Sequence, residues 1–188
     1  MHIRFVNFVN LDKDTLLTVL KWRNRDDIRV KMINQEIISE SSHLKFCLSL
    51  KDRKDCIYYM ALVDGVPSGV INYVKLNYEE LSGEYGLYSI DTRPGIGAVL
   101  GQIAITNYFE TLKFKTLNIE VLENNLNAKQ YNEVCLGFKD PVFISDEYQI
   151  LNDKIGAFHY VMTDKDWNSN IKSRYERTMK RLSYVFED

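Results

Sequence analysis

The sequence predicts an α+β (mixed α/β) fold in which helices flank one central twisted mixed sheet. The patterns run from helices to an antiparallel meander, and then to strand, helix, strand, helix and strands. This order is typical of a single mixed sheet rather than of a doubly wound dinucleotide fold. The length of 188 residues, 45% of them hydrophobic, fits one hydrophobic core. Nine glycines and three prolines exclude collagen-like and low-complexity chains.

Polar caps and apolar spacing predict one strand and three helices in the first fifty residues. Asp and Ser side chains can accept hydrogen bonds from the free amides that begin a helix. The expected elements are, in order, a strand at 3–8, a helix capped by Asp12 or Asp14 and running into Trp22, a short helix through Val30 and Met32, and a helix around His43 capped within 39–42.

Alternation and turn residues predict the rest of the sheet. Asp64-Gly65 lies between two apolar runs, which is a hairpin signal. The expected elements that follow are strands at 57–63, 69–74 and 83–90, a helix over 100–112, a strand at 117–121, a helix at 125–135, and strands near 142–151 and 157–162. The basic tail from 165 to 181 has a helical pattern, and a charge run of this size is usually a solvated helix face.

Composition excludes several function classes. Lys and Arg number 24 against 26 Asp and Glu, so the formal charge of −2 does not favour a nucleic-acid partner. No run of about 18 apolar residues predicts a membrane span. The three cysteines, Cys47, Cys56 and Cys135, form no Cys-x-x-Cys motif, so we expect reduced thiols, a cytoplasmic protein and no metal site. Twelve tyrosines predict that some of them line a cavity.

A glycine-rich loop, Arg93-Pro94-Gly95-Ile96-Gly97-Ala98, lies between a predicted strand and a predicted helix. Free amides and the helix dipole favour an anion at such a position, and glycines let the backbone approach a pyrophosphate. A P-loop is excluded because no Lys-Ser or Lys-Thr follows. A dinucleotide loop fits weakly, because the third glycine is displaced to Gly101, although Glu120 or Glu123 follows about 25 residues on. An ordinary strand-to-helix turn stays open.

The order of parts resembles the GNAT superfamily of acyltransferases. The resemblance rests on residues 83–88 before the loop, 120–128 after it with an Asn-x-x-Ala motif, and Gly137-Phe138. One departure is that the Gln or Arg of the family falls at Thr92, so that Arg93 is one place late. The resemblance implies a GNAT domain over 1–163, a helical extension over 164–188 and an acyl-CoA co-substrate, acetyl-CoA or another. It implies that the following residues bind this co-substrate: Leu87, Tyr88, Arg93, Gly95, Ile96, Gly97, Ala98 and Asn125.

Within the superfamily, residues 10–140 resemble the N-acetyltransferases of nucleotide-linked amino-dideoxy sugars, the pseudaminic acid type. Residues 20–24, 32, 38–39, 43–46, 69–71 and 84–88 carry the likeness. It implies an acceptor site made of Trp22, Arg23, Met32, His43, Phe46, Tyr73 and Lys75. Arg23 offers a planar fork for phosphate, and the aromatic residues offer stacking surface. Alternatively, Trp22 and Phe46 belong to the core, Arg23 pairs with Asp26 or Asp27, and His43 is a satisfied histidine.

The family transfers the acyl group directly, and the resemblance implies roles for three residues. Glu84 is the candidate base, through a water, and His43 is its rival. Backbone amides of Leu87 or Tyr88 would polarise the thioester carbonyl. The general acid of the family, a tyrosine, would fall at Asn132, with Tyr131 one place early. Since one residue turns a helical side chain by about 100°, either a bulge restores Tyr131 to the site or another tyrosine acts.

Other functions stay open at this level. The acceptor could be a protein N-terminus or a polyamine, which an acidic groove would favour, and the chain could also be a non-catalytic CoA-binding module. The resemblance implies a possible homodimer. Neither a nucleic-acid nor a membrane partner is expected.

Overall fold

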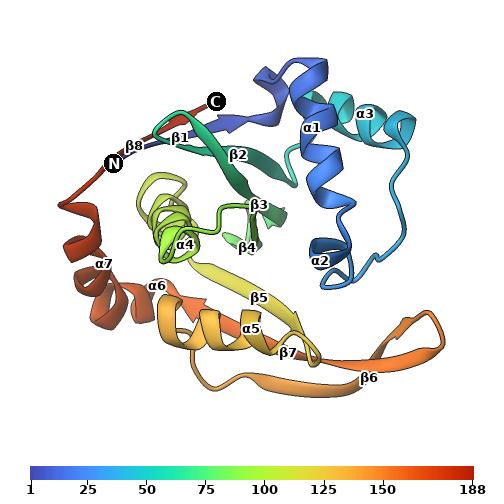
Figure 1. Cartoon of the computed structure of the whole chain (residues 1–188). Coiled ribbons are helices and arrows are strands. Elements are labelled where there is room, and N and C mark those ends of the chain that lie inside the picture. The colour runs from blue at the N-terminus through green and yellow to red at the C-terminus, as the bar shows by residue number, and fades with distance from the viewer.

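The fold is built on an eight-stranded mixed sheet with the strand order β6-β7-β5-β4-β3-β2-β1-β8. The computed structural model describes residues 1–188. Neighbouring strands are antiparallel except in the β4–β5 and β1–β8 pairs, which are parallel. In Figure 1, α1 to α3 lie on one side of the sheet, and α4, α5 and α7 lie on the other. The predicted mixed α/β fold is confirmed.

The N-terminal elements largely follow the prediction. Asp12 caps the first helix, because its Oδ1 accepts the amide of Thr15 at 2.7 Å. The second helix ends at Arg29, so the expectation that it passes through Val30 and Met32 is wrong; the backbone continues there in short turns. The elements are β1 (His2–Asn7), α1 (Lys13–Arg23), α2 (Asp26–Arg29) and α3 (Glu40–Ser49), with single 3-10 turns at Phe8–Asn10 and Leu50–Asp52.

The meander consists of β2 (Ile57–Val63), β3 (Val66–Asn77) and β4 (Ser82–Ser89). The predicted hairpin is confirmed: Asp64 and Gly65 both have positive φ, of 53° and 80°, as a tight hairpin turn requires. β4 is followed by α4 (Ile96–Thr106), a π-helical turn (Asn107–Thr111) and β5 (Thr116–Leu122).

The β4–β5 pair is the feature that positions the site. These two strands are paired over three residues only, from Ser82 opposite Thr116 to Glu84 opposite Asn118. Beyond Glu84 they separate, while the other edge of β4 stays paired with β3 as far as Ser89. The sheet therefore opens into a V, with Glu84 at its vertex.

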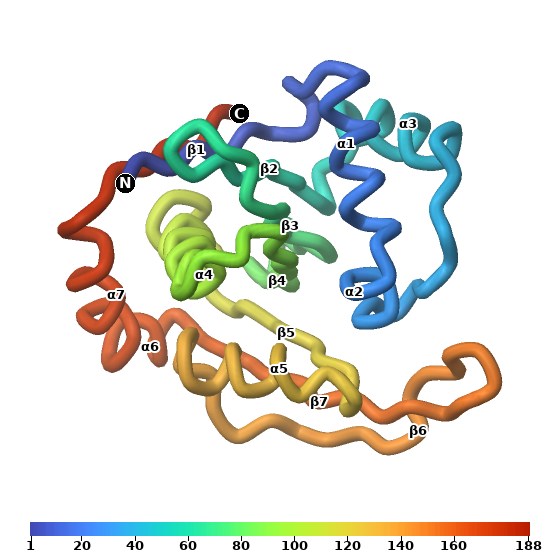
Figure 2. Tube along the Cα trace, viewed as in Figure 1, coloured from blue at the N-terminus to red at the C-terminus, as the bar shows by residue number.

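The last third of the chain adds both helix and sheet. It contains α5 (Leu126–Gln130) with a π-helical turn (Tyr131–Leu136), β6 (Val142–Ile150), β7 (Asp153–Thr163), α6 (Asp164–Asp166) with a π-helical turn (Trp167–Ile171), α7 (Lys172–Met179) and β8 (Ser183–Glu187). The helical tail is present. Strand β8, which no sequence pattern predicted, lies beside β1 (Figure 2) and stacks Phe186 on Phe5 with ring centroids 4.5 Å apart. The division at residue 163 stays a prediction.

Two hydrophobic clusters lie on opposite faces of the sheet. The larger has 27 buried residues and joins the sheet to α4 and α7; it includes Trp167 and Tyr175 from the C-terminal segment. The smaller has eight and lies under α1 and α3. No helix has the length and apolar character needed to cross a membrane.

Candidate active site

A cleft of about 510 Å³ lies where β4 and β5 separate. Its walls come from five places: Asn72 of β3, the far part of β4 (85–89), β5 (119–122), the α5 helix with the turn that follows it, and the segment of α2 and the turns after it. Among the predicted site residues, those that line it are Met32, Leu87, Tyr88, Asn125 and Tyr131.

The β4 wall of the cleft presents unpaired backbone. From Tyr85 to Ser89 the strand pairs with β3 on one edge and with nothing on the other. Amide and carbonyl groups on a free strand edge are available to an extended ligand. Leu87 and Tyr88, which were predicted to polarise an acyl carbonyl, lie in this stretch.

The predicted glycine loop begins α4. Gly95 caps the helix with φ of +84°, a conformation that glycine adopts at little cost. The amides of Gly97 and Ala98 donate to no acceptor within the chain. A side chain at Gly97 would meet nothing nearer than Ser89 Cβ at 4.0 Å, so its face of the helix is open. These features make the helix start suited to an anion.

The guanidinium of Arg93 is bound to Asp91 and is not free to reach an anion at this loop. Its Nε donates to Asp91 Oδ1 at 2.9 Å, and its backbone amide donates to the same atom. Asp91 also accepts the Ser68 hydroxyl at 2.9 Å. Hydrogen bonds from Arg93 hold the pKa of Asp91 well below its usual value. In this structure, Arg93 fastens the loop.

Tyr131 and the next residue, Asn132, both line the cleft, and Tyr131 begins a π-helical turn that runs to Leu136. Such a turn accommodates the extra residue that precedes Gly137, so the predicted bulge is present, while the role of Tyr131 as general acid stays a prediction. The Tyr131 hydroxyl donates to the Gly97 carbonyl at 2.9 Å and thereby joins this helix to the start of α4. Burial raises the pKa of Tyr131 above its usual value, so the phenol keeps its proton.

Glu84 and Lys75 lie next to each other at the vertex of the V, and neither lines the cleft. Lys75 Nζ lies 2.6 Å from Glu84 Oε1, and the side chain of Glu84 is 26% exposed. The hydrogen bond to Glu84 raises the pKa of Lys75. The next residue along β4, Tyr85, already lines the cleft. Glu84 therefore stands one residue from the cleft with its carboxylate held by a lysine.

His43 and Tyr73 lie away from the cleft. His43 is 7% exposed, and its Nε2 is 3.0 Å from the Leu16 carbonyl, between α1 and α3. Burial lowers the pKa of His43, which favours the neutral ring. Tyr73 is fully buried in the larger cluster and donates to the Ala104 carbonyl at 2.7 Å. Both have the contacts of satisfied core residues.

Arg23 is not engaged by the acidic residues that follow it. Arg25 binds Asp27 and Arg29 binds Asp26, while Arg23 Nη2 donates to the Asn34 carbonyl at 2.7 Å. The Nη1 atom of Arg23 is buried without a partner.

The two aromatic residues predicted for the acceptor site pack on the smaller hydrophobic cluster. Trp22 and Phe46 both lie against it, and Phe46 meets Tyr58 edge-on at 5.2 Å.

Glu120 and Asn72 also line the cleft, although neither was predicted as a cleft residue. Glu120 Oε1 is shut off from solvent and has no hydrogen-bond partner. The alternation of Leu117, Ile119 and Val121 carried the signal, since it places the intervening Glu120 on the opposite face of the strand. Asn72 lies over Gly86, whose Cβ, if present, would come within 2.6 Å of the Asn72 amide oxygen.

Comparison with known proteins places this site in a family. No protein-family model matches the chain. Two curated relatives, both named acetyltransferase PseH and from two strains of Campylobacter jejuni, are 31% and 33% identical over 126 residues, which is 67% of this chain and 78% of each relative. The crystal structure of Campylobacter jejuni PseH in complex with acetyl coenzyme A has a TM-score of 0.62 at 25% identity, covering 86% of this chain and 98% of that one.

A further structural neighbour supports the fold alone. Spermidine N-acetyltransferase from Vibrio cholerae, solved with CoA and spermine, has a TM-score of 0.76 at 15% identity and covers 85% of this chain and 95% of that chain. The divided sheet, the glycine loop and these relatives together define a GNAT N-acetyltransferase. Within that superfamily, the chain belongs to the PseH acetyltransferases, the pseudaminic acid type.

Proposed function

We propose that the protein transfers the acetyl group of acetyl-CoA to the amine of a nucleotide-linked amino-dideoxy sugar. The observation that carries the proposal is the cleft between β4 and β5, with its free strand edge beside the open amides at the start of α4. The free edge suits the amide-bearing pantetheine arm of CoA, and the helix start suits its pyrophosphate. Membership of the PseH family supports the acetyl donor and the amino-sugar acceptor.

The transfer is proposed to be direct. The neutral amine attacks the thioester carbon, the carbonyl oxygen takes the negative charge, and free amides of Leu87 or Tyr88 stabilise that charge. Collapse of the intermediate breaks the C–S bond and releases the thiolate of CoA. The hydroxyl of Tyr131, which lines the cleft and carries its proton, then protonates the thiolate.

The proton of the amine is proposed to leave through Glu84. Its carboxylate stands at the vertex, one residue from the cleft lining, so a single water at the closed end of the V would connect the two. Lys75 orients this carboxylate by the 2.6 Å ion pair. His43 is poorly placed for the same task, since its Nε2 is occupied by the Leu16 carbonyl.

The acceptor is proposed to enter from the side of α2. Met32 and Ile33 supply apolar wall, and Lys31 supplies a cation in the cleft lining. Arg23 Nη1, free of any partner, could turn toward a diphosphate.

A polyamine or a protein N-terminus is the second candidate acceptor, and one observation favours it. Asp27, which is paired with Arg25, and Glu120 both line the cleft, so its lining carries two carboxylates against one lysine, Lys31. Such a wall attracts cationic amines.

An acceptor panel separates these candidates. The protein is incubated with acetyl-CoA and either nucleotide-linked amino sugars, N-terminal peptides, or spermidine and spermine, and released thiol is measured. Turnover with an amino-sugar nucleotide supports the proposal, and turnover with polyamines or peptides only overturns it. If acetyl-CoA fails to raise the melting temperature, the chain is not an enzyme of this kind.

We also propose a cytoplasmic location and a homodimer. The three free cysteines support a reducing compartment. The homodimer rests on the likeness to the family, and light scattering of the purified protein tests it by giving the mass of one or two chains of 22.0 kDa.

A further inference from the structure

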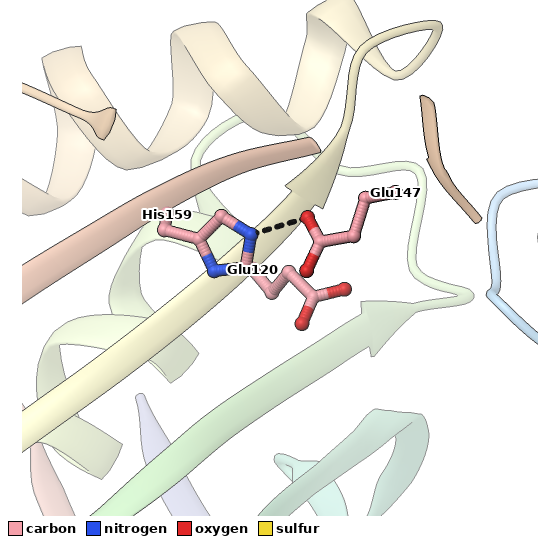
Figure 3. Close-up of side chains that lie close together, drawn as sticks. All are labelled: Glu120, Glu147 and His159. Carbon is pink, nitrogen blue, oxygen red and sulfur yellow. Dashed lines mark hydrogen bonds and ion pairs between the residues drawn. The ribbon is translucent and has the colours of Figure 1, made fainter. Parts of the chain in front are cut away.

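We propose that Glu120, Glu147 and His159 form a binding site for a divalent transition-metal ion of the zinc class. One ligand atom from each residue lies within 4.8 Å of the others. Figure 3 shows the three side chains close together, with Glu147 bonded to the ring of His159; they come from the neighbouring strands β5, β6 and β7. Two carboxylates and an imidazole are hard and borderline donors that together suit Zn²⁺.

Strand register fixes two of the three ligands. Glu120 on β5 lies directly opposite His159 on β7 in an antiparallel pair. Directly opposed residues project from the same face with Cβ atoms about 5 Å apart. This face is turned away from the larger hydrophobic cluster, to which the neighbouring residues Ile119 and Tyr160 belong.

A local irregularity brings in the third ligand. Ile144 pairs with Ala157 and Tyr148 with Ile155, so three residues of β6 face the single residue Gly156. Within this bulge Asp146 has φ of +55°, and the chain turns Glu147 toward the imidazole of His159. Bulges re-aim side chains in this way beside functional sites.

The second observation is the state of the carboxylate of Glu120. Its Oε1 atom is shut off from solvent and accepts no hydrogen bond, which costs free energy unless a cation or donor arrives. Two neighbours lie near this carboxylate without satisfying Oε1: the hydroxyl of Tyr148, whose pKa is raised by burial and by the contact with Glu120, and Lys75, whose ammonium is bound to Glu84. Glu120 therefore keeps an unsatisfied, inward-facing oxygen beside an imidazole and a second carboxylate.

The present spacing is close to that of a metal site. His159 Nε2 and Glu147 Oε2 are 2.6 Å apart. A tetrahedral ion with bonds of about 2.1 Å holds its ligand atoms about 3.4 Å apart, so this pair must open by less than about 1 Å to admit the ion. The side chains of His159 and Glu147 are 30% and 23% exposed, which leaves an entry path.

Zinc titration of the full chain, without a polyhistidine tag, tests the proposal by calorimetry. We expect one Zn²⁺ per chain, and we expect the affinity to fall at least about tenfold in His159→Ala and in Glu147→Gln. Matched controls are His2→Ala and Glu187→Gln. These residues lie at the opposite edge of the sheet, where they bind Ser183 and Arg4.

The titration measures zinc binding and not turnover, so its result tests the metal site independently of catalysis. Circular dichroism shows which variants fold, and Glu147→Gln decides the matter if His159→Ala does not. The absence of a site in the wild type, unchanged affinity in the folded ligand variants, or equal loss in the controls would overturn the proposal. None of these results depends on which acceptor the enzyme uses.

Discussion

Replacing Tyr131 by Phe removes one hydroxyl from the cleft and separates a structural effect from a chemical one. The structural effect is the loss of the 2.9 Å hydrogen bond to the Gly97 carbonyl. Losing such a bond costs about 0.5–1.5 kcal/mol, or up to about 3 kcal/mol if the carbonyl stays unpaired. For a chain of this size, each kcal/mol lowers the melting temperature by about 2–4 °C.

The chemical effect of Tyr131→Phe is expected to be much larger. General acid catalysis contributes about 10²- to 10⁴-fold, so kcat should fall by that factor in a thiol-release assay at saturating substrates. The matched control is Tyr175→Phe, because Tyr175 also donates a buried hydrogen bond to a backbone carbonyl, that of Leu136 at 2.7 Å. The control should lose similar stability and keep its kcat. Wild-type turnover by Tyr131→Phe across the pH range would refute the assignment.

Four further substitutions test other parts of the structure. Gly95→Ala places a Cβ at φ of +84° and should cost about 1–2 kcal/mol in thermal unfolding; an unchanged melting temperature would contradict the left-handed backbone at this cap. Glu84→Gln should lower kcat by about 10²-fold or more, whereas Lys75→Met should lower it less; equal activity of Glu84→Gln and wild type excludes Glu84 as base. The pKa of His43 is lowered on folding, so the unfolded chain binds the proton more tightly, and the stability due to the neutral ring is lost as pH falls below about 6.5. His43→Gln should therefore flatten the melting temperature between pH 7 and 5 while leaving kcat intact, and an equally steep profile would show that other groups cause it.

Local patterns predicted most of the sheet but not its edges. The alternation at 117–121 and the Asp64-Gly65 turn depend on neighbours in sequence, and both elements are found where expected. Strand β8 depends instead on a partner about 180 residues away, β1, against which Phe186 stacks. No local pattern indicates this pairing. Because a basic helical pattern precedes β8, the helical extension was predicted to continue through the residues of β8 to 188.

The candidate site shows the same division. The glycine loop and the helix at Tyr131 were predicted because their chemistry is contiguous in sequence, including the bulge alternative. The burial of Tyr73 was not predicted, because it depends on which face of β3 packs against α4. The meeting of Glu120 with His159 and Glu147 depends on register and on a bulge, neither of which can be read from spacing along the chain.

The three-residue pairing of β4 with β5 has a consequence for hydrogen exchange. Up to Glu84 the two strands are hydrogen-bonded to each other, so the amides in these bonds exchange only when the sheet opens. Past that point, the amides on the free edge of β4 have no partner in β5 and exchange with solvent from the native state. A bound acyl donor that pairs with this edge would slow their exchange, so their protection reports donor binding separately from turnover.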